Sequence, residues 1–165
     1  MASAPKKTLM GIVGAATAAL LIYIVPHFEG VVYQGYLDPV GIPTKCMGDT
    51  HGVVVGKPYS EAECRDSLET QLIAHAEPVL KCTPVLKGRT YQLAAVVSFA
   101  YNIGPDAYCG STTARRFNAG DYHGACRAMN ESDSGRPQWV TAGGKVLPGL
   151  VKRRAAERAL CERGL

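Results

Sequence analysis

The chain has 165 residues, of which 47% are hydrophobic and 19% are charged, so it suits one globular domain with little left over for a second. The formal net charge of +4 falls well short of the concentrated positive charge of a nucleic-acid-binding domain, and no nucleic-acid partner is expected. A mild positive charge does suit a polyanionic target, such as a cell wall or an anionic membrane surface.

The first element is an apolar segment at the N-terminus. Residues 9–25 (LMGIVGAATAALLIYIV) carry no charge, and Lys6 and Lys7 precede them. These 17 residues are at the short limit for a helix that crosses a bilayer. The positive charges before them favour a cytoplasmic N-terminus, with the rest of the chain exported. We therefore expect residues 1–26 to form a membrane segment and residues 27–165 to form the exported domain.

Four interpretations of this segment remain open. A cleaved signal peptide would have its small residues after its most apolar part, whereas Ala16–Ala19 precede Leu20–Val25 here. A permanent anchor would carry more large apolar side chains than this Gly- and Ala-rich first half. A segment that inserts and later leaves the bilayer fits the weak hydrophobicity best. The fourth interpretation is a buried core helix, because a released segment must bury its apolar face.

The body of the chain begins with a region that predicts strands. From Val31 to about Val55 it is rich in Gly, Pro, Tyr and β-branched residues, which indicates a small twisted hairpin region. Ser60 and Glu63 then form an S-x-x-E capping box, which predicts a helix start. We expect Pro78 to end or kink that helix.

The remaining elements are predicted to be helical. Residues 90–101 are apolar nearly all round, which predicts a central buried helix that Asn102–Pro105 ends. Two shorter helices are expected over residues 112–119 and 122–129, and a polar loop over residues 131–137. A basic helix over residues 151–162 is expected to present a solvated face, with binding to anionic wall polymer as the alternative. The order of elements indicates the α+β class.

Six cysteines are spread along the chain, at Cys46, Cys64, Cys82, Cys109, Cys126 and Cys161. An even number in an exported chain predicts up to three disulfides, with free structural cysteines as the alternative. No two cysteines are nearer than 17 residues, so the close ligand pairs of a zinc site are missing and no metal is expected. Six cysteines allow about 15 connectivities, so the pairing stays open. Pairing of neighbouring elements would give Cys46–Cys64, Cys82–Cys109 and Cys126–Cys161.

Two carboxylates stand in the turn-rich region after the apolar segment. Glycoside hydrolysis needs one carboxyl group that donates a proton and another that stays ionised. Glu29 follows Phe28 at the end of the apolar run, where burial would favour the protonated form. Asp38 precedes Pro39 in a turn and is expected to be more solvated, and Thr44 offers a hydroxyl that can hold a water molecule. By itself the acid pair is more often a pair of solvated turn residues.

The surrounding pattern is more specific. The residues form E-x₈-D-x₅-T, with HFEG at the start and LDPVGIPT across the turn. Further matching motifs are CMGDT at residues 46–50, SFAYNIG at 98–104, ST at 111–112, RFNAGD at 116–121, Trp139, GG at 143–144, PGL at 148–150, and Arg153–Arg154 with Glu157. Over roughly residues 27–162 the chain closely resembles the phage-type lysozymes, glycoside hydrolase family 24.

This resemblance implies both a fold and an activity. It implies a lysozyme-like fold, in which a small β-hairpin lobe and a larger helical lobe flank a catalytic cleft, preceded here by the N-terminal apolar helix. It implies hydrolysis of the β-1,4 bond between N-acetylmuramic acid and N-acetylglucosamine in peptidoglycan glycan strands, without a cofactor. Glu29, Asp38 and Thr44 correspond to the family's catalytic set. Tyr101 and Asn102 correspond to cleft positions, and Trp139 either stacks on a sugar or anchors the core.

The apolar segment resembles the signal-arrest-release segment that some family members carry. Such endolysins cause host cell lysis. They are exported while tethered to the host inner membrane, here through residues 9–25, and reach the periplasm after release as active monomers. Because Glu29 follows Val25 closely, it would stand at the membrane surface while the chain is tethered, and the chain would be inactive. Two other functions remain: a lytic transglycosylase acting on the same bond, and a non-catalytic wall-binding protein.

Overall fold

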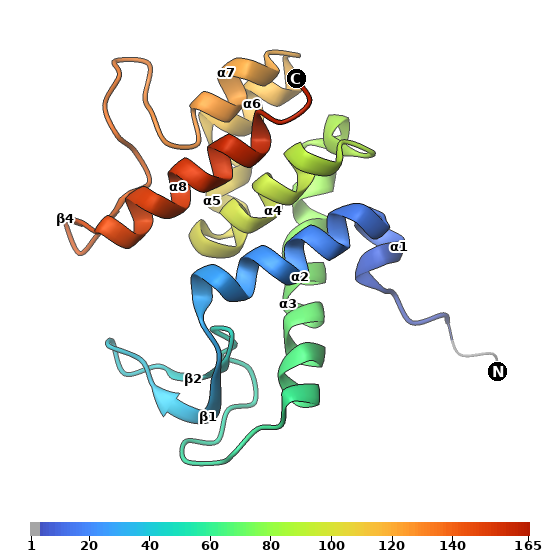
Figure 1. The fold of residues 1–165 in the computed structure, drawn as a ribbon, viewed down its shortest axis with the longest axis vertical. Coiled ribbons are helices and arrows are strands. Elements are labelled where there is room, and N and C mark those ends of the chain that lie inside the picture. Colours follow the sequence, from blue (N-terminus) through green and yellow to red (C-terminus); the bar gives the residue numbers. More distant parts are fainter. Residues whose placement is uncertain (1–3) are drawn as a thin grey trace.

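A computed structural model describes residues 4–165 and shows an α+β fold, as expected. A small β region lies at one end of a long helix, α3, and a helical body surrounds its other half (Figure 1). The helices are α1 (Leu9–Val13), α2 (Ala15–Glu29), α3 (Glu61–Cys82), α4 (Thr90–Ile103), α5 (Pro105–Cys109), α6 (Thr112–Asn118), α7 (Tyr122–Arg127) and α8 (Pro148–Cys161), with a 3₁₀ turn η1 (Pro84–Leu86). The strands form two antiparallel pairs, β1 (Val32–Leu37) with β2 (Pro43–Cys46) and β3 (Thr141–Ala142) with β4 (Lys145–Val146).

The N-terminal segment differs from the single apolar helix that we expected. Gly14, with φ of 87°, separates α1 from α2, and α2 continues through Pro26 to Glu29. No helix within residues 4–165 has both the length and the apolar character that a membrane crossing requires. Side chains on one side of both helices are buried, and α1 packs on α3 while α2 packs on α4. In this conformation the segment is part of the core.

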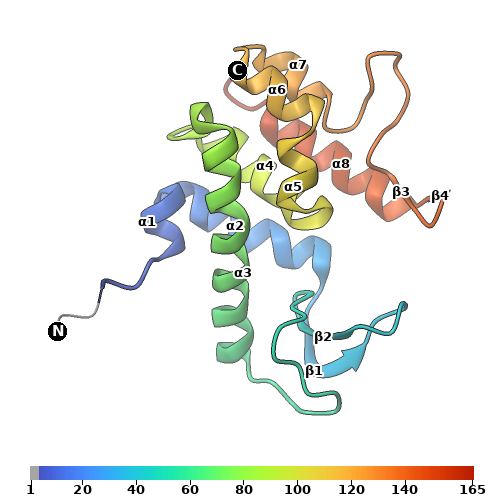
Figure 2. The same cartoon turned by 180° about the vertical axis from the view of Figure 1, so that it is seen from behind.

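Helix α4 is the centre of the helical body, as its apolar sequence predicts. Every residue from Gln92 to Ala100 is buried. Helices α2, α3, α5 and α8 all contact it. Seen from behind, α5, α6 and α7 cover the side of the body that α2 leaves open (Figure 2). Helix α5 was not predicted, because Gly104 and Pro105 indicated only the end of the preceding helix; Pro105 instead occupies the first position of a new one.

Helix α3 begins as predicted but ends later. The Ser60 hydroxyl accepts a hydrogen bond from the Glu63 N–H at 3.1 Å, and the Glu63 carboxylate accepts one from the Ser60 N–H at 2.7 Å, so the capping box is complete. Of the two alternatives that we expected at Pro78, an end of the helix is wrong, because α3 continues to Cys82. A proline removes one N–H donor, and here the turn after it packs on α5 and is held there by a disulfide.

Three disulfides connect neighbouring elements, which confirms that the six cysteines are paired. Cys46–Cys64 joins β2 to α3, Cys82–Cys109 joins α3 to α5, and Cys126–Cys161 joins α7 to α8. The first of these fixes the hairpin against α3, and the last fixes the end of α8 against the body. Disulfides therefore fix both the β1–β2 hairpin, which follows Glu29 in the chain, and helix α8.

The expectation of a solvated basic helix is wrong for the inner face of α8. Arg153, Arg154 and Glu157 are 4%, 0% and 1% exposed, respectively. Helix α8 packs directly on α4, so these three charged side chains face the interior of the body. Spacing on the helix alone does not show this, because charged residues at such spacing are usually on a solvated surface.

Candidate active site

Glu29 lies where three parts of the chain meet. It is the last residue of α2, and its side chain is 21% exposed. Its Oε1 accepts a hydrogen bond from Arg153 Nη1 of α8 at 2.5 Å. The turn after β2 approaches from the other side, since a Cβ atom added at Gly48 would lie 3.6 Å from Glu29 Oε2. Gly48 has φ of 81°, a conformation that favours glycine, so both its backbone and its missing side chain suit this approach.

The surroundings of Glu29 are more polar than the sequence indicates. We expected a carboxyl group in an apolar environment beside Phe28. In the structure the Phe28 ring instead lies against the guanidinium of Arg153, with the carbon of that group 5.0 Å from the ring centroid. The half-buried carboxyl group is therefore one member of an ion pair with Arg153. It faces a cavity of about 360 Å³ that is lined by Phe28, Glu29, Asn102, Leu147, Gly149, Leu150 and Arg153.

Asp38 and Thr44 lie at the turn of the β1–β2 hairpin. Asp38 Oδ1 accepts hydrogen bonds from the N–H groups of Val40 and Ile42, at 2.9 and 2.8 Å. Thr44 is 4% exposed, and its hydroxyl donates to the Ile42 carbonyl oxygen at 2.9 Å. The turn thus brings Asp38 and Thr44 together through Ile42. Glu29 precedes the same hairpin, and no hydrogen bond or ion pair within residues 4–165 joins it directly to either of them.

The three other predicted site residues differ in position. Asn102 lines the cavity beside Glu29, and its Oδ1 accepts a hydrogen bond from Arg154 Nη2 at 2.7 Å. The Tyr101 hydroxyl donates to the Met47 carbonyl oxygen at 2.8 Å, so Tyr101 connects α4 to the turn that approaches Glu29. Burial raises the pKa of Tyr101, and the Glu29 carboxylate adds to this. Trp139 is half-buried and packs edge-on against Phe99, with ring centroids 5.6 Å apart.

A buried ionic cluster behind Glu29 was not predicted. Arg153 Nε donates to Glu157 Oε1 at 2.9 Å, and Arg154 Nε lies 3.1 Å from Glu157 Oε2. Burial raises the pKa of Glu157, and the charges of Arg154 and Arg153 oppose that shift. Burial lowers the pKa of Arg154 to about 10. The signal in the sequence was the R-R-x-x-E spacing, which places both arginines within reach of one glutamate along the helix.

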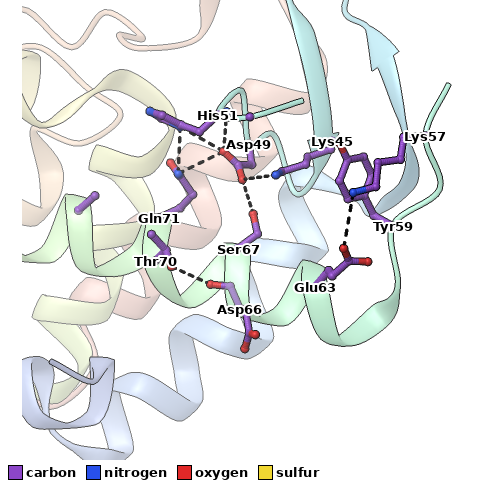
Figure 3. A pocket seen from close by; sticks show the side chains of 12 residues that line it. Lys45, Asp49, His51, Lys57, Tyr59, Glu63, Asp66, Ser67, Thr70 and Gln71 are labelled. Carbon is purple, nitrogen blue, oxygen red and sulfur yellow. Dashed lines mark hydrogen bonds and ion pairs between the residues drawn. The ribbon is translucent and has the colours of Figure 1, made fainter. Parts of the chain in front are cut away.

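A larger cavity than the one beside Glu29 lies on the other side of the turn that approaches this residue. It has a volume of about 610 Å³ between α3 and the chain from Lys45 to Tyr59 (Figure 3). Asp49, at its inner wall, accepts a hydrogen bond from the Ser67 hydroxyl at 2.6 Å, and its carboxylate lies 3.6 Å from the Lys45 ammonium group. Gly48 therefore faces Glu29 while the Asp49 side chain is directed toward α3. Asp49 is an extra acid close to the hairpin, but its carboxylate is occupied by structural contacts.

No group of three or more His, Cys, Asp or Glu side chains in the described part of the chain is arranged to hold a metal ion. The cavity beside Glu29 is lined by its carboxyl group, the Asn102 amide, the Arg153 guanidinium and apolar side chains. Such an arrangement can present a proton donor to a polar, uncharged substrate whose faces contact apolar side chains.

Comparison with known proteins places the chain in a family. Residues 26–157 match the family described as Phage lysozyme. A SAR-endolysin of Bacteriophage PS119 is 39% identical over 134 residues, which cover 81% of this chain and 75% of that protein. The active form of the P1 phage endolysin Lyz has a similar fold, with a TM-score of 0.77, 22% identity, and coverage of 92% of this chain and 88% of that one. The secreted inactive form of Lyz fits less well, with a TM-score of 0.56, 17% identity, and coverage of 90% and 94%.

Proposed function

The chain belongs to the phage lysozyme family, and from this premise we propose that it is an endolysin. It hydrolyses the β-1,4 bond between N-acetylmuramic acid and N-acetylglucosamine in peptidoglycan and so lyses the host cell. The observation that carries this proposal is the position of Glu29, a half-buried carboxyl group held by Arg153 at the wall of a cavity.

Glu29 donates the proton to the leaving glycosidic oxygen. Its Oε1 is occupied by Arg153 Nη1, whereas no hydrogen bond within residues 4–165 involves its Oε2. A proton on Oε2 is therefore free to face the substrate. The absence of a side chain at Gly48 leaves this oxygen accessible. General acid catalysis requires this combination of a fixed carboxyl group and one unoccupied oxygen within reach of the scissile bond.

Asp38 acts on the sugar ring, and Thr44 acts on a water molecule. Asp38 Oδ1 is held by two backbone N–H groups, so the carboxylate has a fixed orientation and Oδ2 is left for substrate or water. Its charge stabilises the positive charge that develops on the sugar ring. The Thr44 hydroxyl gives its hydrogen to the Ile42 carbonyl, and its oxygen can therefore accept a hydrogen bond from a water molecule.

Replacement of the proton donor tests the proposal. We expect Glu29→Gln to lower the rate of peptidoglycan solubilisation by about 10²–10⁴-fold, because the amide keeps the shape of the side chain but cannot donate the proton. Glu61→Gln, an exposed change in the first turn of α3, is the matched control and should keep the original rate. Full lysis by Glu29→Gln would contradict this chemistry and would favour a wall-binding protein, whereas 1,6-anhydro products from the original chain would indicate a lytic transglycosylase.

The N-terminal segment regulates this activity. While tethered to the inner membrane, residues 9–25 would have to form one continuous helix of about 25 Å. Such a helix withdraws the buried side chains of α1 and α2 from the body and separates Glu29 from Arg153. The fold described here is more similar to the active form of Lyz than to its secreted inactive form, which supports the view that this is an active conformation. Equal specific muralytic activity of membrane-bound and released fractions would contradict this part of the proposal.

A further inference from the structure

A buried acid lies directly behind the Glu29–Arg153 pair. Glu157 is 1% exposed and Arg153 is 4% exposed, so their contact is shielded from water. We infer that Glu157 is a positioning residue for Glu29: it holds the guanidinium of Arg153 so that Nη1 meets the Glu29 carboxyl group. This inference rests on the proposed role of Glu29 as the proton donor.

The guanidinium of Arg153 has an acceptor on each of three helices. Nε donates to Glu157 Oε1 on α8 at 2.9 Å, and Nη2 donates to the Ser98 carbonyl oxygen on α4 at 2.9 Å. Nη1 donates to Glu29 Oε1 at the end of α2 at 2.5 Å. Because a guanidinium is planar and its N–H directions are fixed, two anchored edges determine where the third points. Glu157 and the Ser98 carbonyl are the anchored edges, and Glu29 is the group that they locate.

Glu157 is itself held from two sides. The Ser98 hydroxyl donates to its Oε1 at 2.8 Å, and the Arg154 guanidinium lies 3.1 Å from its Oε2. Arg154 in turn donates to Asn102, which lines the same cavity as Glu29. The carboxylate of Glu157 is therefore oriented by α4 and by its own helix rather than by solvent. An anchor with this support can hold Arg153 in one orientation.

The same cluster sets the charge beside Glu29. Arg153 and Arg154 of α8 act on Glu29 from one side, and Glu157 offsets them. Tyr101 of α4 and Asp49 after β2 are the titratable groups on the other side. Without the charge of Glu157, Arg153 and Arg154 would be balanced by Glu29 alone. The net positive charge next to the proton donor would then rise.

The pH–rate profile of the full chain tests this role. We expect Glu157→Gln to move the alkaline limb of the kcat profile about one pH unit lower, as a change of one buried charge at this range implies. Arg153→Met should move the same limb in the opposite direction. The matched control is Glu162→Gln at the C-cap of the same helix. Arg158 Nε contacts Glu162 Oε1 at 2.8 Å with the same i,i+4 spacing on an exposed face. This control should leave the profile unchanged.

The outcomes separate positioning from folding and from the proposed chemistry. The inference would be overturned if folded Glu157→Gln kept the original alkaline limb of the kcat profile. It would also be overturned if Glu157→Gln and Arg153→Met moved this limb in the same direction. If Glu157→Gln does not fold, Glu157→Asp keeps the charge but is shorter, and it should keep the limb while kcat falls about tenfold. An original kcat in folded Glu157→Asp would equally overturn it. Activity of Glu29→Gln in the same assay would instead refute the proposed function.

Discussion

At the scale of single residues, Asp49 shows how one carboxylate joins the hairpin to the helical body. Burial by itself would raise its pKa, but hydrogen bonds from Ser67 and His51, together with the Lys45 charge, outweigh burial and lower the pKa below its ordinary value. A carboxyl group with a lowered pKa in the folded state stabilises the fold above the pKa of the unfolded chain. That stabilisation is lost as the pH falls through the lowered value. The residue thus links the acid stability of the protein to the turn beside Glu29.

We therefore expect Asp49→Asn to reduce the free energy of unfolding at neutral pH by about 1–3 kcal/mol, because the contacts of a buried charged acceptor are weakened. The loss should be largest above about pH 4, the range in which the unfolded carboxyl group is ionised, and should shrink at lower pH. Denaturant unfolding at several pH values measures it. Asp66→Asn on the exposed face of α3 is the control. An equal loss at pH 2 and pH 7 would refute the electrostatic origin.

At the scale of elements, the long helix α3 connects the β region to the helical body. Its start depends on the reciprocal hydrogen bonds between Ser60 and Glu63, and its side is linked to β2 by Cys46–Cys64. A cap at this position therefore stabilises the end of α3 that carries the hairpin and not only one helical turn. The sequence identified this cap because its pattern is local.

Ser60→Ala should destabilise the protein by about 1 kcal/mol, because the first-turn N–H of Glu63 loses its acceptor. For a domain of this size that corresponds to a fall in Tm of about 2–4 °C. Thr70→Ala, on an exposed position within the same helix, is the comparison and should change Tm less. A Ser60→Ala protein that melts with the original Tm would show that the cap contributes nothing measurable.

Other elements could not be predicted from local pattern. The basic character of residues 151–162 indicated a solvated helix, yet Arg153, Arg154 and Glu157 are buried. Ser98 and Asn102 of α4 provide partners that help to compensate this burial. A pairing between distant helices is not visible in the spacing of one helix. The proposed catalytic motif could be recognised in the sequence because residues near one another in the chain form it. Its support by α8, in contrast, joins residues 124 positions apart.

At the scale of the whole molecule, the apolar N-terminal segment is part of the core of the folded protein. Leu21 is 0% exposed, whereas its neighbour Ile22 is 52% exposed. The composition of residues 9–25 left membrane insertion and core burial both open, because apolar side chains serve either. The structure shows the buried alternative, in which α2 packs on α4 and ends at Glu29. The packing of α2 on α4 therefore also positions Glu29.

Leu21→Ala should destabilise the folded protein by about 2–5 kcal/mol, since it leaves a cavity against α4. Ile22→Ala, which removes the same number of carbon atoms at the adjacent exposed position, is the matched control and should stay within about 0.5 kcal/mol. Thermal and denaturant unfolding of the purified protein measure both. Equal effects of the two substitutions would mean that α2 does not pack in solution as described.

The central claim is that the folded chain adds water across the glycosidic bond of peptidoglycan, with Glu29 as the proton donor. Digestion of purified peptidoglycan in H₂¹⁸O, followed by mass spectrometry of the released fragments, tests it most directly. We expect the original chain to produce N-acetylmuramic acid ends that carry one oxygen from the labelled water, and Glu29→Gln to produce none. Unlabelled 1,6-anhydro ends from the original chain, or labelled ends from Glu29→Gln, would contradict the account.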